Sequence, residues 1–462
     1  MIQGKQSLLY ITNTDTIIFN PTTKGSCVID TMQTCLLYIT NTDTIIFSPV
    51  YNEQIDLNLV LKYKKIIFSN YELDEYLFYK YEINDLTNLE YNLNNSSQYN
   101  LSFGSNFNCS VDNLPNELTH LIFGSNFNCS VDKLPQGLTH LIFGSNFNQT
   151  VDNLPSGLIQ LTFGDYFNCP VDNLPEQLIL LTFGFNFNNP VNNLPPLLTQ
   201  LIFDYEFSNY VDNLPKQLTQ LTFGWIFNNS VNNLPKCLTH LTFGEYFNKS
   251  VDELPNSLIQ LIFGYNFNQP VDKLPCELTI LTFDYKFNQP VNKLPISLIY
   301  LTFGWDFNQP VDKLPEGLIQ LTFDHAFNHT INKLPEYITH LTFGNTFNKR
   351  DNLSHNIKYL KLNCNNQYLI DYLPNGIEKL EFENIFDLEL NNLPLSIKSI
   401  SFNINSCYNK ELNCLPNFIE SIQLPMYYDK KMFKIPKELK KIICFRNYKF
   451  IKDFDNLDVE TY

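Results

Sequence analysis

A 20-residue unit recurs from Leu101 to Phe347 and constrains the fold more than any other feature of the chain. Thirteen leucines stand at the same place in successive units, the first at Leu101 and the last at Leu341. A fixed period of this size is typical of solenoids, in which each unit packs only against its neighbours. We therefore predict a stack of short coils rather than the several globular domains that 462 residues would otherwise suggest.

One unit, residues 118–137, shows how a coil is built. Leu121 and Phe123 lie two residues apart, so on a strand both side chains point inward, whereas His120 points outward. Pro135 has no amide donor and favours an extended backbone before it. The return half of the unit is too short, and too rich in Pro, Asn and Asp, for a regular helix. We predict a mainly β solenoid of about 18 coils, with short parallel strands of about five residues and little helix. The six apolar positions expected to face the core are Leu121, Phe123, Phe127, Val131, Leu134 and Leu138.

The repeats divide the chain into three predicted segments. Residues 1–100 are expected to form an N-terminal β-rich cap with degenerate repeats, and residues 101–350 hold the regular 20-residue units. Residues 351–462 combine degenerate repeats with a C-terminal cap, because the apolar spacing persists there, for example at Leu380 and Phe382. No linker rich in Gly, Ser or Pro separates these segments.

The N-terminal segment contains its own duplication. Residues 8–19 and 36–47 are the same twelve residues, and each copy predicts two short strands around a polar turn. Met32 precedes the second copy, so either Met1 or Met32 is the start of the chain. Further on, Ile66 and Phe68 match the strand core of the later units.

The net charge of the chain limits the kinds of partner that it can bind. A net charge of −16 repels phosphate backbones and argues against nucleic acid as the main ligand. The C-terminal end is locally basic, and we interpret it as a solvated end cap, with a binding patch as the alternative. Its cationic residues are Lys430, Lys431, Lys434, Lys437, Lys440, Lys441, Arg446, Lys449 and Lys452.

The expected compartment is reducing and aqueous. The first 30 residues lack a signal-peptide pattern, and no apolar stretch is long enough to span a bilayer. Cys109 and Cys129 share one repeat position, where neighbouring thiols could form a disulfide, but we expect free thiols. We therefore expect a cytoplasmic protein without a membrane partner.

Three polar columns have structural interpretations. Asn128 recurs in almost every unit and is expected to bond to backbone groups in the turns above and below it. His120 and His140 share a register, where the alternatives are a metal-binding pair and a polar face; we favour the polar face because no third ligand lies nearby. The Asp column that contains Asp112 and Asp132 alternates with Asn later in the chain, which favours a turn-forming role over catalysis.

The two positions after the strand glycine vary while the rest of the unit is nearly constant. Both tryptophans of the chain occur there, and exposed Trp and Tyr are frequent anchors of protein interfaces. We predict an aromatic stripe that binds a protein partner; the alternative is drift at exposed positions. The candidate residues are Tyr166, Phe185, Tyr205, Trp225, Tyr246, Tyr265, Tyr285 and Trp305.

The unit resembles a known repeat family. Its spacing is similar to that of short leucine-rich repeats, and sequences such as Phe267-Asn268-Gln269-Pro270 resemble the FNIP repeat. The resemblance covers at least residues 101–350. It implies a leucine-rich-repeat-like solenoid with a role in protein interaction, and the family is abundant in social amoebae and in giant DNA viruses of amoebae. Some viral members carry an N-terminal F-box that recruits a ubiquitin ligase, and residues 1–100 show no Leu-Pro-rich three-helix segment.

These observations lead to three hypotheses of different classes. The first is a non-catalytic scaffold for an unknown protein partner, in the host cytoplasm if the protein is viral, with self-association left open. The second is a substrate-recognition subunit of a ubiquitin ligase. The third is a carbohydrate-active β-solenoid hydrolase, which would need clustered carboxylates on one face. Because the chain has no GxSxG, HExxH, phosphate-binding glycine loop or kinase motif, we predict neither an enzyme nor a cofactor.

Overall fold

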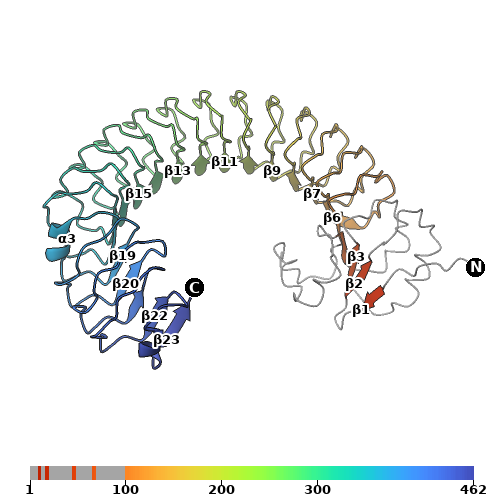
Figure 1. Ribbon diagram of the computed structural model, residues 1–462. Helices are drawn as coiled ribbons and strands as arrows, with labels where there is room; N and C mark the ends of the chain where they lie inside the picture. Colours follow the sequence, from red (N-terminus) through yellow and green to blue (C-terminus); the bar gives the residue numbers. More distant parts are fainter. Residues whose placement is uncertain (1–8, 12–15, 20–43, 48–64, 69–98) are drawn as a thin grey trace, which may run out of the picture. The chain divides into compact units, whose positions relative to one another are not determined.

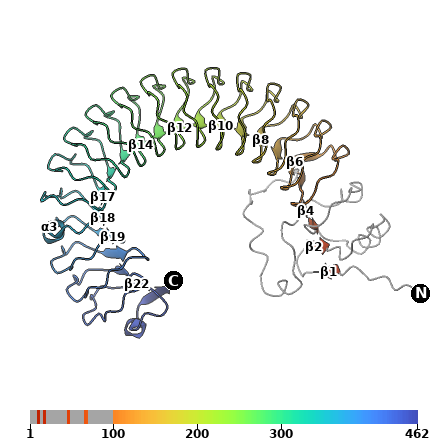
Figure 2. The same cartoon turned by 45° about the horizontal axis from the view of Figure 1, so that its top comes forward.

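The protein is a parallel β-solenoid of about 18 coils, as the repeat predicts, and the part of the chain that the structure describes has almost no helix. The chain divides into two compact units, unit 1 with residues 1–227 and unit 2 with residues 228–462. Within each unit, the strands line the inner side of the coils and the return segments fan outward (Figure 1, Figure 2). The computed structural model describes residues 9–11, 16–19, 44–47, 65–68 and 99–462.

Unit 1 begins with the hairpin of β1 (Leu9–Ile11) and β2 (Thr16–Phe19), which pair antiparallel. This confirms the two strands predicted for the first duplicated copy. Met32 and residues 36–43 lie outside the described residues. From β2 to β11 each strand pairs in parallel with the next along the chain. The strands after the hairpin are β3 (Thr44–Phe47), β4 (Lys65–Phe68), β5 (Tyr99–Ser102), β6 (Leu118–Ile122), β7 (His140–Ile142), β8 (Gln160–Thr162), β9 (Leu180–Thr182), β10 (Gln200–Ile202) and β11 (Gln220–Thr222).

Unit 2 continues the same parallel pairing from β12 to β23. The degenerate repeats form strands where the apolar spacing predicts them. Two short helices, α3 (Gln367–Asp371) and the 3₁₀-helix η1 (Ile451–Phe454), are the helical elements of the described part of the chain. The strands are β12 (His240–Thr242), β13 (Gln260–Ile262), β14 (Ile280–Thr282), β15 (Tyr300–Thr302), β16 (Gln320–Thr322), β17 (His340–Phe343), β18 (Tyr359–Leu362), β19 (Lys379–Phe382), β20 (Ser399–Phe402), β21 (Ser421–Gln423), β22 (Lys441–Cys444) and β23 (Asp458–Thr461).

All six predicted core positions are buried throughout the regular coils except at Leu334, which is partly buried. Most regular strands have only three residues, fewer than the five expected, because the chain turns immediately after the second core residue. Beyond the strand, one further backbone bond continues the ladder: the amide of Phe263 donates to the carbonyl of Thr282 at 2.9 Å.

Phenylalanine stacks give the coils their wedge shape. Within one coil of unit 2, the rings of Phe263 and Phe267 stack with centroids 3.6 Å apart. From coil to coil, Phe263 lies 5.4 Å from Phe283, and Phe267, deeper in the coil, lies 6.1 Å from Phe287. Paired strands are separated by about 4.8 Å, so the spacing grows with distance from the sheet. The stacked rings therefore hold the outer side of the coils open, and the strands lie on the inner side.

The glycine after the strand is required by close contact between coils rather than by its backbone angles. A Cβ atom at Gly264 would lie 2.3 Å from the carbonyl oxygen of Gly244. Aspartate replaces this glycine in three coils, at Asp204, Asp284 and Asp324, and each has glycine in the coil on either side. The register therefore tolerates a side chain only where the neighbouring coils carry none.

The asparagine column forms the predicted hydrogen-bond ladder. The side-chain oxygen of Asn268 accepts from the backbone amide of Asn288 at 3.0 Å and from the side-chain amide of Gln289 at 3.1 Å. The same backbone bond recurs at 2.8–3.1 Å in other coils of both units. The asparagine thus satisfies an amide of the next coil that the short strands cannot reach.

Replacing one ladder asparagine should cost more stability than replacing a nearby asparagine of the same coil. We expect Asn268→Ala to lower the free energy of unfolding by about 1–2 kcal/mol, because it leaves the amide of Asn288 without its acceptor. The matched control Asn266→Ala should cost less than about 0.5 kcal/mol. Urea unfolding followed by circular dichroism measures both, and equal losses would contradict a structural role for the ladder.

Candidate functional site

The two variable positions after the strand glycine form two separate columns on the turn that ends each strand. If the strand leucine, such as Leu221, is counted as register 1, their residues stand at registers 5 and 6 of every unit, for example Trp225 and Ile226. At register 5 the coils bring aromatic side chains into face-to-face stacks, which we call the aromatic ladders. The unit 1 ladder contains Phe185, Tyr205 and Trp225, and the unit 2 ladder contains Tyr265, Tyr285, Trp305 and His325.

The unit 1 ladder has an exposed ring at each end. The ring centroids of Phe185 and Tyr205 are 4.4 Å apart, and those of Tyr205 and Trp225 are 5.5 Å apart. Phe185 is 41% exposed and Trp225 is 45% exposed, although both side chains are large and apolar. The stack therefore places a contiguous aromatic surface in contact with solvent.

The unit 2 ladder is one ring longer. Tyr265 stacks on Tyr285 at 4.5 Å, Tyr285 on Trp305 at 5.5 Å, and Trp305 on His325 at 4.1 Å. The ammonium group of Lys286 lies 5.4 Å from the Tyr265 ring. Desolvation raises the pKa of Tyr285, and the neighbouring Tyr265 raises it further. The two phenol groups thus lie side by side on the ladder.

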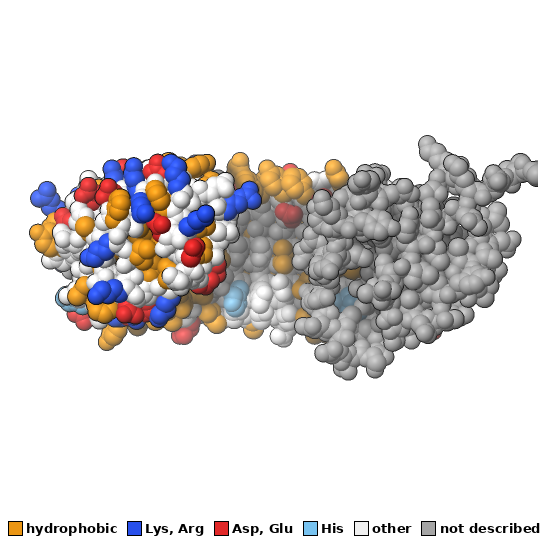
Figure 3. Space-filling model, turned by 60° about the horizontal axis from the view of Figure 1, so that its bottom comes forward, with side chains coloured by type: hydrophobic (Ala, Val, Ile, Leu, Met, Phe, Trp, Pro, Cys, Tyr) orange, Lys and Arg blue, Asp and Glu red, His pale blue; other side chains and the backbone are white. Residues whose placement is uncertain are grey.

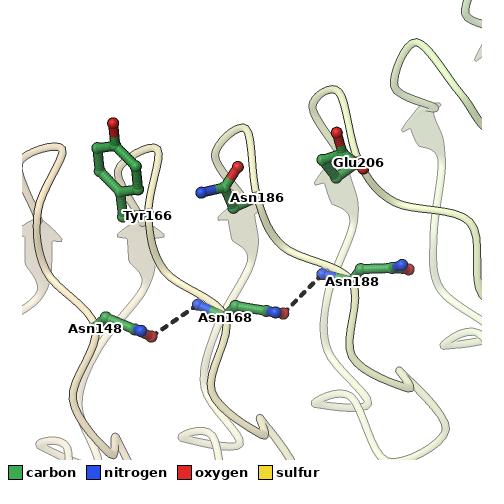
Figure 4. Close-up of a pocket in the computed structure, with 6 residues that line it drawn as sticks. All are labelled: Asn148, Tyr166, Asn168, Asn186, Asn188 and Glu206. Carbon is green, nitrogen blue, oxygen red and sulfur yellow. Dashed lines mark hydrogen bonds between the residues drawn. The ribbon is translucent and has the colours of Figure 1, made fainter.

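Tyr166 and Tyr246 do not belong to the ladders. Both stand at register 6, and both are exposed, Tyr166 at 56%. Tyr166 lines a shallow polar pocket of about 490 Å³ in unit 1, and its ring points away from the asparagine ladder on the other side of the pocket (Figure 4). The predicted stripe of eight residues is therefore two stacks and two separate tyrosines. The pocket is lined by Asn148, Tyr166, Asn168, Asn186, Asn188 and Glu206.

His325 extends the unit 2 ladder and was not among the predicted residues. The sequence did indicate this residue, because His325 occupies register 5 in the coil that follows those of Tyr285 and Trp305. Its ring stacks on Trp305, and its Nδ1 atom is buried without a hydrogen-bond partner in the described part of the chain.

Carboxylates lie beside the unit 2 ladder at Glu245, Asp284 and Asp324, and a fourth, Asp306, directly follows Trp305. Burial raises the pKa of Glu245, and the negative charge of Asp284 adds to the rise. Desolvation likewise raises the pKa of Asp324, and Asp284 again contributes. Among the described residues, no lysine or arginine forms an ion pair with Glu245, Asp284 or Asp324. The ladder therefore carries negative charge that the solenoid itself does not neutralise.

The aspartates at register 12, such as Asp252, form what we call the outer aspartate column, and several of them do have ion-pair partners. Its carboxylates pair with lysines of the next coil, so these lysines are ion-paired as well as solvated. The pairs are Lys133 with Asp112 at 3.1 Å, Lys273 with Asp252 at 3.1 Å, Lys293 with Asp272 at 3.2 Å and Lys333 with Asp312 at 4.0 Å.

His120 and His140 stack face to face with ring centroids 4.1 Å apart. Each Nδ1 atom is hydrogen-bonded to the hydroxyl of the preceding threonine, at 2.9 Å for Thr119 and 2.8 Å for Thr139. Parallel rings direct their remaining nitrogens along parallel lines, so this pair cannot converge on one metal ion. The described residues contain no group of three or more side chains suited to holding a metal.

The basic C-terminal end carries mixed charge. Figure 3 shows lysine and arginine side chains among acidic ones on the C-terminal coils of unit 2. Lys431 pairs with Asp453 at 3.2 Å, and Lys440 pairs with Glu420 at 2.6 Å. Cys109 and Cys129 are free thiols, as expected.

Comparison with known proteins agrees with this geometry. The family model described as "FNIP Repeat" matches residues 110–146, 147–186, 210–246, 227–265, 247–286, 267–306 and 287–325. A solved structure titled "The crystal structure of CroV588 a novel circular LRR protein structure" is 30% identical, with a TM-score of 0.66. The similarity covers 95% of this chain and 77% of that one. The chain belongs to the FNIP-repeat family. The predicted resemblance to leucine-rich repeats is thereby confirmed.

Other comparisons add little to the FNIP-repeat assignment. YopM from Yersinia enterocolitica WA-314 is 18% identical, with a TM-score of 0.40, over 75% of this chain and 77% of that chain. No curated protein matches the sequence. Within the described residues, no helix has the length and apolar character needed to cross a membrane.

The stacked histidines should make this FNIP-repeat protein less stable in mild acid. Burial, and then the charge of His140, lowers the pKa of His120 to about 4, below the value of about 6.5 expected in an unfolded chain. As pH falls from about 6.5 to about 4, the unfolded state takes up a proton that the folded state does not. The stability lost over this range should be on the order of 1 kcal/mol, since solvent reaches the half-buried ring.

Urea unfolding at pH 7.5 and pH 4.5 measures this effect. His120→Gln should reduce the acid-dependent loss, because glutamine occupies the same register at Gln160 and does not titrate. His240→Gln is the matched control, since glutamines flank His240 in both neighbouring coils. An unchanged pH dependence of stability in His120→Gln would show that His120 does not cause the loss of stability in acid.

Proposed function

We propose that this FNIP-repeat protein is a non-catalytic scaffold that binds a partner protein through its aromatic ladders. The observation that carries the proposal is the exposure of Phe185, Trp225 and Trp305 within the aromatic stacks, at one of the two variable registers after the strand glycine. Large aromatic side chains dominate the energetics of protein interfaces. The repeat fold itself is typical of protein-interaction scaffolds.

Stacking also suits the ladders to binding. Each ring stacks on at least one neighbouring ring at 4.1–5.5 Å, so its rotamer is restricted before any partner arrives. A preordered side chain loses little conformational entropy on association. The ladders then supply apolar contact area at low entropic cost.

The proposed setting is the cytoplasm of an amoeba, or of an amoebal host if the protein is viral. The support for this setting is the family resemblance and the free thiols of the described cysteines, which fit a reducing compartment.

Removing the tryptophans should weaken partner binding without unfolding the protein. We expect Trp225→Ala with Trp305→Ala to reduce capture of the partner from amoeba lysate at least about tenfold, because each substitution removes an exposed anchor. Quantitative mass spectrometry of the captured proteins measures the change. The matched control is Tyr210→Ala with Tyr337→Ala, which removes one exposed aromatic residue outside the ladder from each unit.

The control pair makes the alternatives distinguishable. A purely structural ladder would lower the unfolding midpoint of the tryptophan variant and leave its captured proteins unchanged, which would overturn the proposal. Enrichment of ubiquitin-ligase core subunits would favour the adaptor hypothesis instead, and self-capture would indicate an oligomer.

A further inference from the structure

We propose that the unit 2 ladder binds an extended basic segment of the partner, with arginine or lysine side chains at every third residue. The ladder consists of Tyr265, Tyr285, Trp305 and His325. Of the carboxylates beside it, those that would meet the cations belong to Glu245, Asp284 and Asp324; Asp306 stands at the next register, after Trp305. The inference rests on the proposed function and adds the chemistry of the partner.

The first argument is the orientation of the rings. Because the four rings stack face to face, their inner π-faces cover one another. The Lys286 ammonium already lies over the Tyr265 ring at 5.4 Å, so mainly ring edges and hydroxyl groups remain for a ligand. Ring edges carry partial positive charge, so the rings alone do not attract a cation. They can, however, pack against the aliphatic stem of an arginine or lysine side chain whose charged end reaches beyond them.

The second argument is charge complementarity. Within the described part of the chain, Glu245, Asp284 and Asp324 lack the lysine partners that the outer aspartates have. Burial raises the pKa values of Glu245 and Asp324, and the charge of Asp284 adds to both, although His325 partly lowers the pKa of Asp324. Asp284 thus repels each of the other two carboxylates. A partner that brings positive charge to this surface would relieve that repulsion.

The third argument is spacing. The three carboxylates stand in alternate coils, at registers 5, 4 and 4 of their units. The ring-to-ring steps from the coil of Asp284 to the coil of Asp324 are 5.5 Å and 4.1 Å, so these alternate coils lie about 10 Å apart at the ladder. A polyproline II segment rises about 3.1 Å per residue and returns to the same face every third residue, about 9.3 Å on. Cations at every third residue would therefore meet successive carboxylates.

Peptide register tests the spacing on the unaltered protein. Fluorescence anisotropy with a labelled peptide of four Arg-Pro-Pro units should give at least fivefold tighter binding than a peptide of equal composition with its arginines in adjacent pairs. A peptide of four Glu-Pro-Pro units should not bind. Equal affinities for the two basic peptides would overturn the spacing argument, because they would show attraction by net charge alone.

Isosteric variants test the carboxylates. Glu245→Gln, Asp284→Asn and Asp324→Asn together should weaken binding of the Arg-Pro-Pro peptide at least tenfold. The matched control is Asp252→Asn, Asp272→Asn and Asp312→Asn, which removes three negative charges from the outer column, where asparagine already occurs at Asn292. The control should change the affinity less than twofold. Equal losses in the two triple variants would overturn the inference.

The two proposals can fail separately. If the tryptophan variant loses its captured partner and the carboxylate variant retains it, the scaffold function stands and the basic segment is wrong. If neither variant loses a partner, the ladders are not the binding surface, and both proposals fail.

Discussion

Face-to-face stacking of two phenylalanines per coil is the interaction on which the rest of the solenoid depends. Phe263 and Phe267 fill one coil, and each also stacks on its equivalent in the next. Ring spacing along these columns exceeds the separation of hydrogen-bonded strands, so coils cannot stack as flat layers. Each coil becomes a wedge, with its strand on the narrow inner side. The turns at the strand ends, where the ladders lie, follow from the same geometry.

In-register stacking makes every position of the unit a column, and its chemistry decides what that column does. Asparagine at one register gives a hydrogen-bond ladder, because its oxygen reaches the amide of the next coil. Aspartate and lysine at adjacent registers give ion pairs between coils, such as Lys273 with Asp252. Aromatic residues at register 5 stack on one another, and their outer edges stay exposed. Only in the last case does the column leave apolar surface for a partner.

Most of the fold follows from the period, and even the degenerate coils obey it. Leu360 and Leu380 lie buried in paired strands, as their spacing predicts, although the repeat around them is worn. The candidate site was predicted less completely. The sequence places the aromatic residues on the turns, but adjacent registers such as those of Tyr246 and Trp305 could be separated only by seeing which rings stack. His325 was likewise recognised as a ladder residue only from the structure, in which its ring stacks on Trp305 where the next aromatic residue would stand.

The sequence by itself determined the coil: its length, its six buried positions and its asparagine ladder, since each depends on contacts that repeat with the chain. Only the tertiary structure decided how wide the coils open, which rings cover one another and which charges find partners. These properties depend on distances between side chains in neighbouring coils, and a one-dimensional repeat fixes their order without fixing those distances. Asp252 and Asp284 illustrate the difference, because a lysine of the next coil reaches the first and none forms an ion pair with the second among the described residues.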